Sequence, residues 1–128
     1  MEILNYGHES QTVEFKTSFI HSANSKNPDQ AIIIFRVVDA MMNSDGGKIF
    51  IGVDDNGNEV VGPNYGVKGD MHWLHFKSND EYCRYINHKM DGYFKNAKQI
   101  HNLVYAEETE NEHVVVINVK KSSRIEYI

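Results

Sequence analysis

The sequence predicts a single α+β domain, in which a mixed β-sheet packs with two helices in the order β-α-β-β-α-β-β. Three observations lead to this prediction. Several short segments alternate or run apolar as strands do, two longer segments carry apolar residues at helical spacing, and turn-forming residues separate them. A chain of 128 residues is long enough for one domain with its own core, so residues 1–128 are taken as one domain.

The first strand is expected over residues 11–19. Val13 and Phe15 alternate there with Glu14 and Lys16, which predicts one apolar and one polar face. Because Val13 and Phe15 need an apolar cover, this strand is expected to share a sheet with the next apolar strand of the chain.

The first helix is expected from residue 29 to about residue 42, after a polar loop over 21–28. Asn27 is suited to cap this helix, and Pro28 suits its first turn. Apolar residues then recur at helical spacing. The β-branched run at 31–35 makes a strand the competing interpretation, but the length of the segment and the capping signals favour a helix.

The central part of the chain predicts a hairpin. Residues 48–53 are continuously apolar after Lys48, as in a strand covered on both faces. The turn sequence at 54–58 follows, and residues 59–61 are expected to return as the partner strand. Residues 63–78 are expected to be irregular.

The distal part predicts a helix and a second hairpin. Residues 80–95 carry aromatic and aliphatic residues near helical spacing. Residues 100–106 and 113–120 are expected to pair across an acidic loop, in which four glutamates lie between positions 107 and 112.

The charge balance bears on the kind of partner. The formal net charge is −5, whereas dedicated non-specific nucleic-acid binders are usually basic. The acidic residues concentrate in the loop before residue 113, however, and basic residues lie in or beside the expected strands. A local basic face on an acidic domain is therefore considered, formed by Lys16, Lys48, Lys120, Lys121 and Arg124.

The cysteine content and the lack of targeting segments indicate the cellular compartment. Cys83 is the single cysteine, so an internal disulfide is excluded, and a reducing compartment is expected. No apolar stretch reaches the length of a membrane span, and the first residues lack a signal-peptide pattern. These observations predict a cytoplasmic domain that does not enter a membrane.

A group of carboxylates is the main candidate site. Glu9 and Glu14 precede Lys16 on the first strand segment, and the pair Asp54 and Asp55 ends the next apolar strand. Oxygen ligands suit Mg²⁺ or Mn²⁺, and such an ion supports phosphodiester cleavage. The alternative is a solvated strand face on which Glu14 and Lys16 form an inconsequential ion pair.

Two segments carry a family resemblance. ESQTVEFK at 9–16 and NSDGGKIFIGVDDNGNEVVG at 43–62 resemble the Schlafen AlbA-type domain, described as a DNA-binding domain. The resemblance implies that fold and a nucleic-acid-binding module for DNA or RNA, within a larger regulatory or defence protein. Relatives continue beyond the last strand, so the chain is expected to be either truncated at its C-terminal end or a minimal version of the domain. Relatives also pair two such lobes, so a homodimer is considered.

The resemblance also implies an alternative activity. In Schlafen-type nucleases the acidic trio of this motif is catalytic, and by motif alignment it corresponds here to Glu9, Glu14 and Asp55, with Lys16 at the scissile phosphate. The alternative is thus a divalent-metal-dependent endoribonuclease with Mg²⁺ or Mn²⁺ on these three acids. A third alternative is a protein-interaction or assembly domain without chemistry.

Two other motifs are weaker. The Gly46-Gly47-Lys48 turn follows a helix and precedes a strand, the reverse of a P-loop, so no ATP site is expected. Four metal-capable side chains lack the paired spacing of a zinc site: His72, His75, Cys83 and His88. Four aromatic residues could stack on unpaired bases, but most are expected in the core: Trp73, Phe76, Tyr82 and Tyr85.

Overall fold

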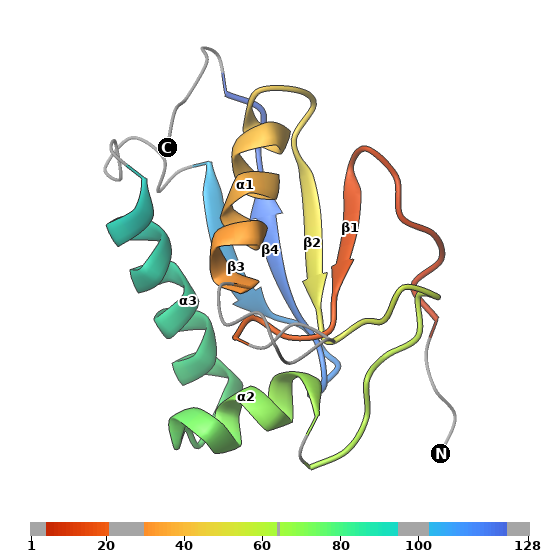
Figure 1. Cartoon of the computed structure of the whole chain (residues 1–128), viewed down its shortest axis with the longest axis vertical. Coiled ribbons are helices and arrows are strands. Elements are labelled where there is room, and N and C mark those ends of the chain that lie inside the picture. Colours follow the sequence, from red (N-terminus) through yellow and green to blue (C-terminus); the bar gives the residue numbers. More distant parts are fainter. Residues whose placement is uncertain (1–4, 21–29, 64, 95–102, 123–128) are drawn as a thin grey trace.

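A four-stranded mixed sheet is the centre of the fold (Figure 1). The computed structural model describes residues 5–20, 30–63, 65–94 and 103–122. The elements are β1 (Val13–Lys16), α1 (Gln30–Met42), β2 (Gly47–Ile51), α2 (Gly66–Leu74), α3 (Asn79–Tyr93), β3 (Val104–Glu108) and β4 (Val115–Val119). The predicted α+β class is confirmed.

The sheet has the strand order β1-β2-β4-β3. β1 runs parallel to β2, with Val13 opposite Lys48 and Phe15 opposite Phe50, and the other two pairs are antiparallel. The predicted pairing of segment 11–19 with segment 48–53 in one sheet is therefore confirmed. A parallel pair needs a crossover connection, and α1 lies in that connection.

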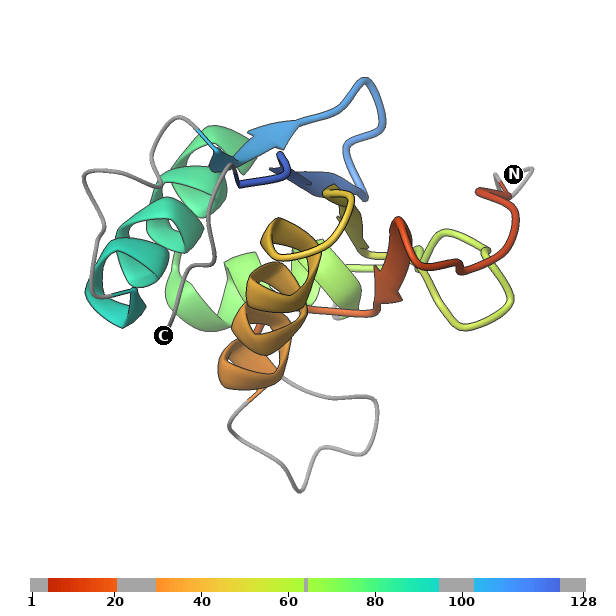
Figure 2. The same cartoon turned by 90° about the horizontal axis from the view of Figure 1, so that it is seen from above.

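Helices α1 and α3 cover one face of the sheet, as the view from above shows (Figure 2). Side chains from three strands point into this helix-covered face. Ile49, Ile117 and Ala106 lie in register across β2, β4 and β3, and each is at most 6% exposed. Because side chains alternate along a strand, the neighbouring residues point to the opposite face. None of the described helices covers that opposite face.

The middle of the chain differs from the sequence prediction. Residues 59–61 do not form a strand: Glu59 makes only an isolated bridge to Val53. The side chain of Asp54 accepts backbone hydrogen bonds from Asn56 and Asn58, which holds the turn. Because β1 and β4 already flank β2, a strand over residues 59–61 finds no free edge of β2 to pair with. The segment 63–78, expected to be irregular, contains α2, so the domain has three helices in its described part.

The outer edge of β3 is closed by a side chain of α3. Asn87 donates a hydrogen bond to the carbonyl of Ala106 at 3.2 Å and accepts one from its N–H at 2.8 Å. The amide side chain thus takes the place of one residue of a further strand. An unpaired strand edge is a template for association with another chain, so this contact protects β3.

A buried carboxylate ties the segment after β1 to the helices. Asp70 of α2 is 1% exposed and accepts hydrogen bonds from the N–H groups of Phe19 at 2.8 Å and Ile20 at 3.3 Å. The hydroxyl of Tyr82 on α3 donates a short hydrogen bond to the same carboxylate. Three donors stabilise this charge away from water.

Some predicted features lie outside the described residues: the loop at 21–28 with Asn27 and Pro28, and Arg124. Within the described ranges, no helix has both the length and the apolar character needed to cross a bilayer.

Candidate nucleic-acid interface

Three residues form a row across the face of the sheet that the helices leave uncovered. Lys48 of β2 lies opposite Asn118 of β4, which lies opposite Tyr105 of β3. Lys48 is exposed, Tyr105 is 38% exposed, and Asn118 is half-buried. Asn118 donates a hydrogen bond to Glu107 at 2.8 Å. We call Lys48, Asn118 and Tyr105 the open row.

The open row continues beyond β4. The N–H of Lys120 donates to the carbonyl of Leu103 at 2.7 Å, so the β3–β4 ladder extends one residue past Val119. Alternation along this extension places Lys120 on the face of Asn118. Lys120 and its neighbour Lys121 are both exposed. The open row and Lys120 together combine an aromatic ring and an amide with two lysines.

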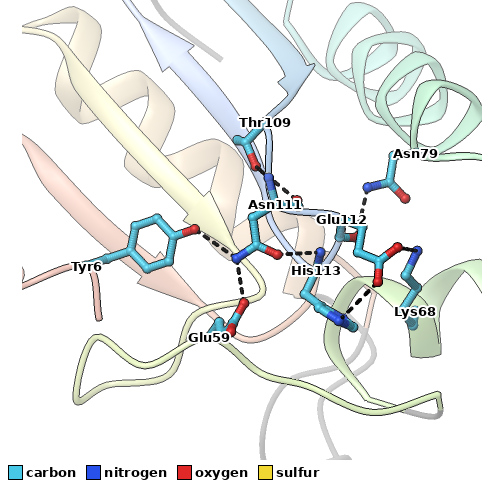
Figure 3. A network of polar contacts seen from close by, with 8 residues as sticks. All are labelled: Tyr6, Glu59, Lys68, Asn79, Thr109, Asn111, Glu112 and His113. Carbon is cyan, nitrogen blue, oxygen red and sulfur yellow. Dashed lines mark hydrogen bonds and ion pairs between the residues drawn. The ribbon is translucent and has the colours of Figure 1, made fainter. Parts of the chain in front are cut away.

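The next row on the same face is covered. Phe15 and Phe50 lie in register, and the ring of Tyr6 packs 5.2 Å from that of Phe50. The side-chain amide of Asn111 donates to the Tyr6 hydroxyl at 3.1 Å and also to Glu59, as Figure 3 shows. The N-terminal segment thus covers part of this face and leaves the open row uncovered.

Lys16 does not share a face with Lys48. It pairs in register with buried Ile51, so its side chain points to the helix-covered side of the sheet at the β1 edge. Its ammonium group lies 3.5 Å from the carboxylate of Glu14, and both side chains are about one-quarter exposed (21% and 25%). The predicted set of basic residues is therefore divided between two faces.

Glu9 lies outside β1 and contacts its backbone. Its carboxylate accepts a hydrogen bond from the N–H of Phe15 at 3.1 Å. The carbonyls of Thr12 and Lys16 accept from β2, so the intervening odd-numbered residues direct their backbone groups away from β2. Glu9 therefore closes the outer edge of β1, as Asn87 closes that of β3.

Asp55 lies in the exposed turn after β2. β2 ends at Ile51, and the turn held by Asp54 carries Asp55 past the strand end. Glu9 is used at the strand edge and Glu14 faces Lys16. Across the described ranges, no three His, Cys, Asp or Glu side chains are arranged to hold a metal ion. The structure therefore does not bring Glu9, Glu14 and Asp55 together as such a group, and an Mg²⁺ or Mn²⁺ site on these three acids stays a prediction.

The Gly46-Gly47 turn has a packing role. A Cβ on Gly46 would lie 2.6 Å from the carbonyl oxygen of Val119, and a Cβ on Gly47 would lie 2.6 Å from that of Thr12. Gly46 also has a φ of +75°, which favours glycine. These glycines allow the end of α1 to join β2 between its two neighbouring strands, and the order helix, turn, strand is as predicted.

The metal-capable residues of the helices have separate surroundings. Cys83 is buried, and burial, with smaller contributions from nearby carboxylates led by Glu108, raises the pKa of its thiol to about 12. His72, His75 and His88 are exposed. Among the four aromatic residues named from the sequence, Tyr82 is fully buried in the core and Trp73 is 65% exposed.

Tyr105 and Asn118 were not identified from the sequence. The available signal was alternation: Val104 and Ala106 are buried on either side of Tyr105, and Ile117 and Val119 on either side of Asn118. The register that aligns both with Lys48 joins three distant segments, and it depends on which strands are neighbours.

Comparison with known protein families gives a match. The family model described as Schlafen, AlbA_2 matches residues 9–128, which is most of the chain. No curated protein and no solved structure shows a significant match.

Proposed function

Because the chain belongs to the Schlafen AlbA_2 family, we propose that it binds nucleic acid through the open row of its sheet. The carrying observation is the register that aligns Lys48, Asn118 and Tyr105 on a face without a described helix. The family match supports association with nucleic acid. The choice of this surface is our own inference from the arrangement of the side chains.

The open row and the adjoining Lys120 offer contacts that nucleic acid uses. Lys48 and Lys120 supply cations for phosphates, and Tyr105 supplies a ring on which a base stacks. Neighbouring strands lie about 4.8 Å apart, so the row spans about 10 Å from Lys48 to Tyr105. This span suits a strand of nucleic acid that crosses the sheet.

Electrostatics restricts the binding to this region. The net charge of −5 repels a polyanion at long range, so affinity depends on the few lysines of the open face. Glu107, an acid on this face, is hydrogen bonded to Asn118. Binding through two or three phosphate contacts decreases with salt, with a slope proportional to the number of contacts.

Fluorescence anisotropy with labelled single- and double-stranded DNA and RNA tests the proposal. Lys48→Glu is expected to weaken binding to the preferred nucleic acid by at least about tenfold at low salt. Lys89→Glu makes the same charge change on α3, at the helix-covered face, and serves as the matched control. Equal losses of affinity in the two variants, or no binding by the wild type at low salt, would rule out the open row as the nucleic-acid-binding surface.

A further inference from the structure

The ring of Tyr105 is open to solvent on the face of the sheet that carries the open row. It is 38% exposed, and no other ring or cation packs against it within the residues that the structure describes. The other large apolar side chains that are exposed in the described ranges, Tyr65 and Trp73, lie just before α2 and within it, outside the sheet. Tyr105 thus offers this face of the sheet an aromatic surface for an external contact.

Asn118 presents a hydrogen-bond acceptor beside this ring. Its Nδ2 donates to the Glu107 carboxylate at 2.8 Å, so the amide is turned with Nδ2 toward Glu107 and Oδ1 away from it. Oδ1 accepts no hydrogen bond from the described residues, and it retains access to solvent. Asn118 lies directly opposite Tyr105, and Cβ atoms of such a pair are about 5 Å apart. A planar group on the ring therefore has an acceptor within reach of its edge.

Two cations lie close to the ring and the acceptor. Lys48 is directly opposite Asn118, and Lys120 is two residues beyond Asn118 along the extension of β4. Steps of ~4.8 Å across the sheet and ~6.7 Å along the strand place their Cα atoms about 8 Å apart. Neither lysine forms an ion pair with a described residue, whereas Lys16 is paired with Glu14. Two unpaired cations at this spacing suit neighbouring phosphates of one backbone.

A duplex has access to only part of this set. In a duplex each base is covered on its faces by its neighbours and on its Watson–Crick edge by its partner, so neither the Tyr105 ring nor the Asn118 acceptor finds an open base. A duplex therefore engages the lysines alone. Its second strand also brings phosphates toward Glu107, which is exposed two residues from Tyr105 along β3, and like charges repel.

We infer that the open row selects single-stranded over double-stranded nucleic acid, and that Tyr105 makes the selection. One unpaired base stacks on the ring of Tyr105, an N–H group at its edge donates to Oδ1 of Asn118, and the flanking phosphates meet Lys48 and Lys120. The inference rests on the proposed function and names the class of nucleic acid that this surface takes.

The next row of the same face limits the stacking to one position. The ring of Tyr6 packs 5.2 Å from that of Phe50, and Phe15 and Val116 are at most 5% exposed. The described part of this face therefore offers one ring to a base. Every base has a face that stacks, so a single stacking position selects unpaired bases with little regard to sequence.

The test compares three ligands by fluorescence anisotropy at low salt. They are a twenty-nucleotide strand of mixed sequence, its duplex with the complementary strand, and an abasic strand of the same length, which keeps the phosphates and lacks the bases. Wild type is expected to bind the strand at least about fivefold more tightly than either of the others, the lower end of what one stacked base contributes. The duplex carries twice the phosphates, so charge alone predicts the opposite order.

Three variants assign the preference to the ring. Tyr105→Leu is expected to lose about fivefold in affinity for the strand and to keep its affinity for the duplex and the abasic strand. The retained duplex affinity also shows that this variant is folded. Tyr105→Phe keeps the ring and is expected to keep the preference. Tyr65→Leu makes the same substitution at an exposed tyrosine outside the sheet, and it is the matched control.

The outcomes separate this inference from the proposed function. Equal binding of the three ligands by wild type, or tighter binding of the duplex, with loss of affinity in Lys48→Glu, overturns the selection and leaves the open row standing. A preference that Tyr105→Leu retains, or that Tyr65→Leu loses to the same extent, overturns the role of Tyr105. Absence of binding to all three ligands at low salt removes the open row and the selection together.

Discussion

The carboxylate of Glu9 and the backbone N–H of Phe15 form a 3.1 Å hydrogen bond at the edge of β1 that faces away from β2. The motif glutamate therefore has a structural task in this fold, independent of any metal. Its acceptor satisfies a donor that would otherwise be presented to solvent or to another strand. This contact changes what substitution of Glu9 is expected to do.

Glu9→Ala is expected to lower the free energy of unfolding by about 1 kcal/mol, because a charge-assisted hydrogen bond is lost at a partly exposed edge. Asp55→Ala, in the exposed turn, is expected to change it by less than about 0.5 kcal/mol. Urea unfolding without metal measures both. The contrary outcome is that millimolar Mn²⁺ raises the free energy of unfolding of the wild type and that neither variant shows this increase. The two acids then share a metal ion, and a purely structural role of Glu9 at the edge of β1 is insufficient.

Tyr82→Phe is expected to destabilise the domain by about 1–3 kcal/mol. Burial, aided by the neighbouring Asp70 carboxylate, raises the pKa of the Tyr82 phenol well above its usual range, so the hydroxyl remains a donor. Its removal leaves a 1% exposed carboxylate with one donor fewer. Thermal and urea unfolding check this, with Tyr105→Phe as control because that ring is 38% exposed. Equal effects in the two variants would contradict a stabilising role for the hydrogen bond between Tyr82 and Asp70.

Asn87→Ala is expected to cost about 1–2 kcal/mol, since both the N–H and the carbonyl of Ala106 lose their partner. The exposed β3 edge is also expected to increase self-association at high protein concentration. His88→Ala alters the neighbouring, exposed position and serves as control. Light scattering and urea unfolding measure the two effects. Unchanged association in Asn87→Ala would show that the amide is dispensable for edge protection.

Cys83 predicts a pH dependence of stability. The thiol pKa is raised from 9.0 to about 12 in the folded domain, mainly by burial. Above pH 9 the unfolded chain loses this proton while the folded chain keeps it, so the contribution of Cys83 to stability falls as pH rises toward 12, at most ~1.4 kcal/mol per pH unit. Below pH 9 it has no effect. Unfolding of wild type and Cys83→Ala between pH 8 and 10.5 measures it, and parallel curves would contradict it.

The sheet pairing could be predicted because local pattern decides it. The alternation at Val13 and Phe15 required an apolar cover on one face of the strand. The apolar run that contains Ile49 and Ile51 required burial as well. The structure meets both requirements by pairing the two segments in one sheet. Helix α2 was missed although Val67, Met71 and Leu74 recur at helical spacing. The glycines and aromatic residues around them obscured that period.

The candidate site was less predictable for a physical reason. Side-chain direction, which places Lys16 and Lys48 on opposite faces, depends on alternation and also on the register in which β1 pairs with β2. The environment of Asn118 depends on β2 and β3, which meet it only in the folded chain. The spacing of residues along the sequence does not show which distant segments come into contact in the folded chain.

The parallel pairing of β1 with β2 has a consequence for how the domain folds. Lys16 and Gly47 are separated by thirty positions, so closing this connection costs more chain entropy than closing the short loop between β3 and β4. We therefore expect the hairpin, joined to α3 through Asn87, to form first and β1 to dock late. The same order applied in reverse makes β1 the first strand to open, so its amides exchange with solvent sooner than those of β4. The strand that carries the motif glutamate and lysine is thus expected to be the least stable part of the sheet.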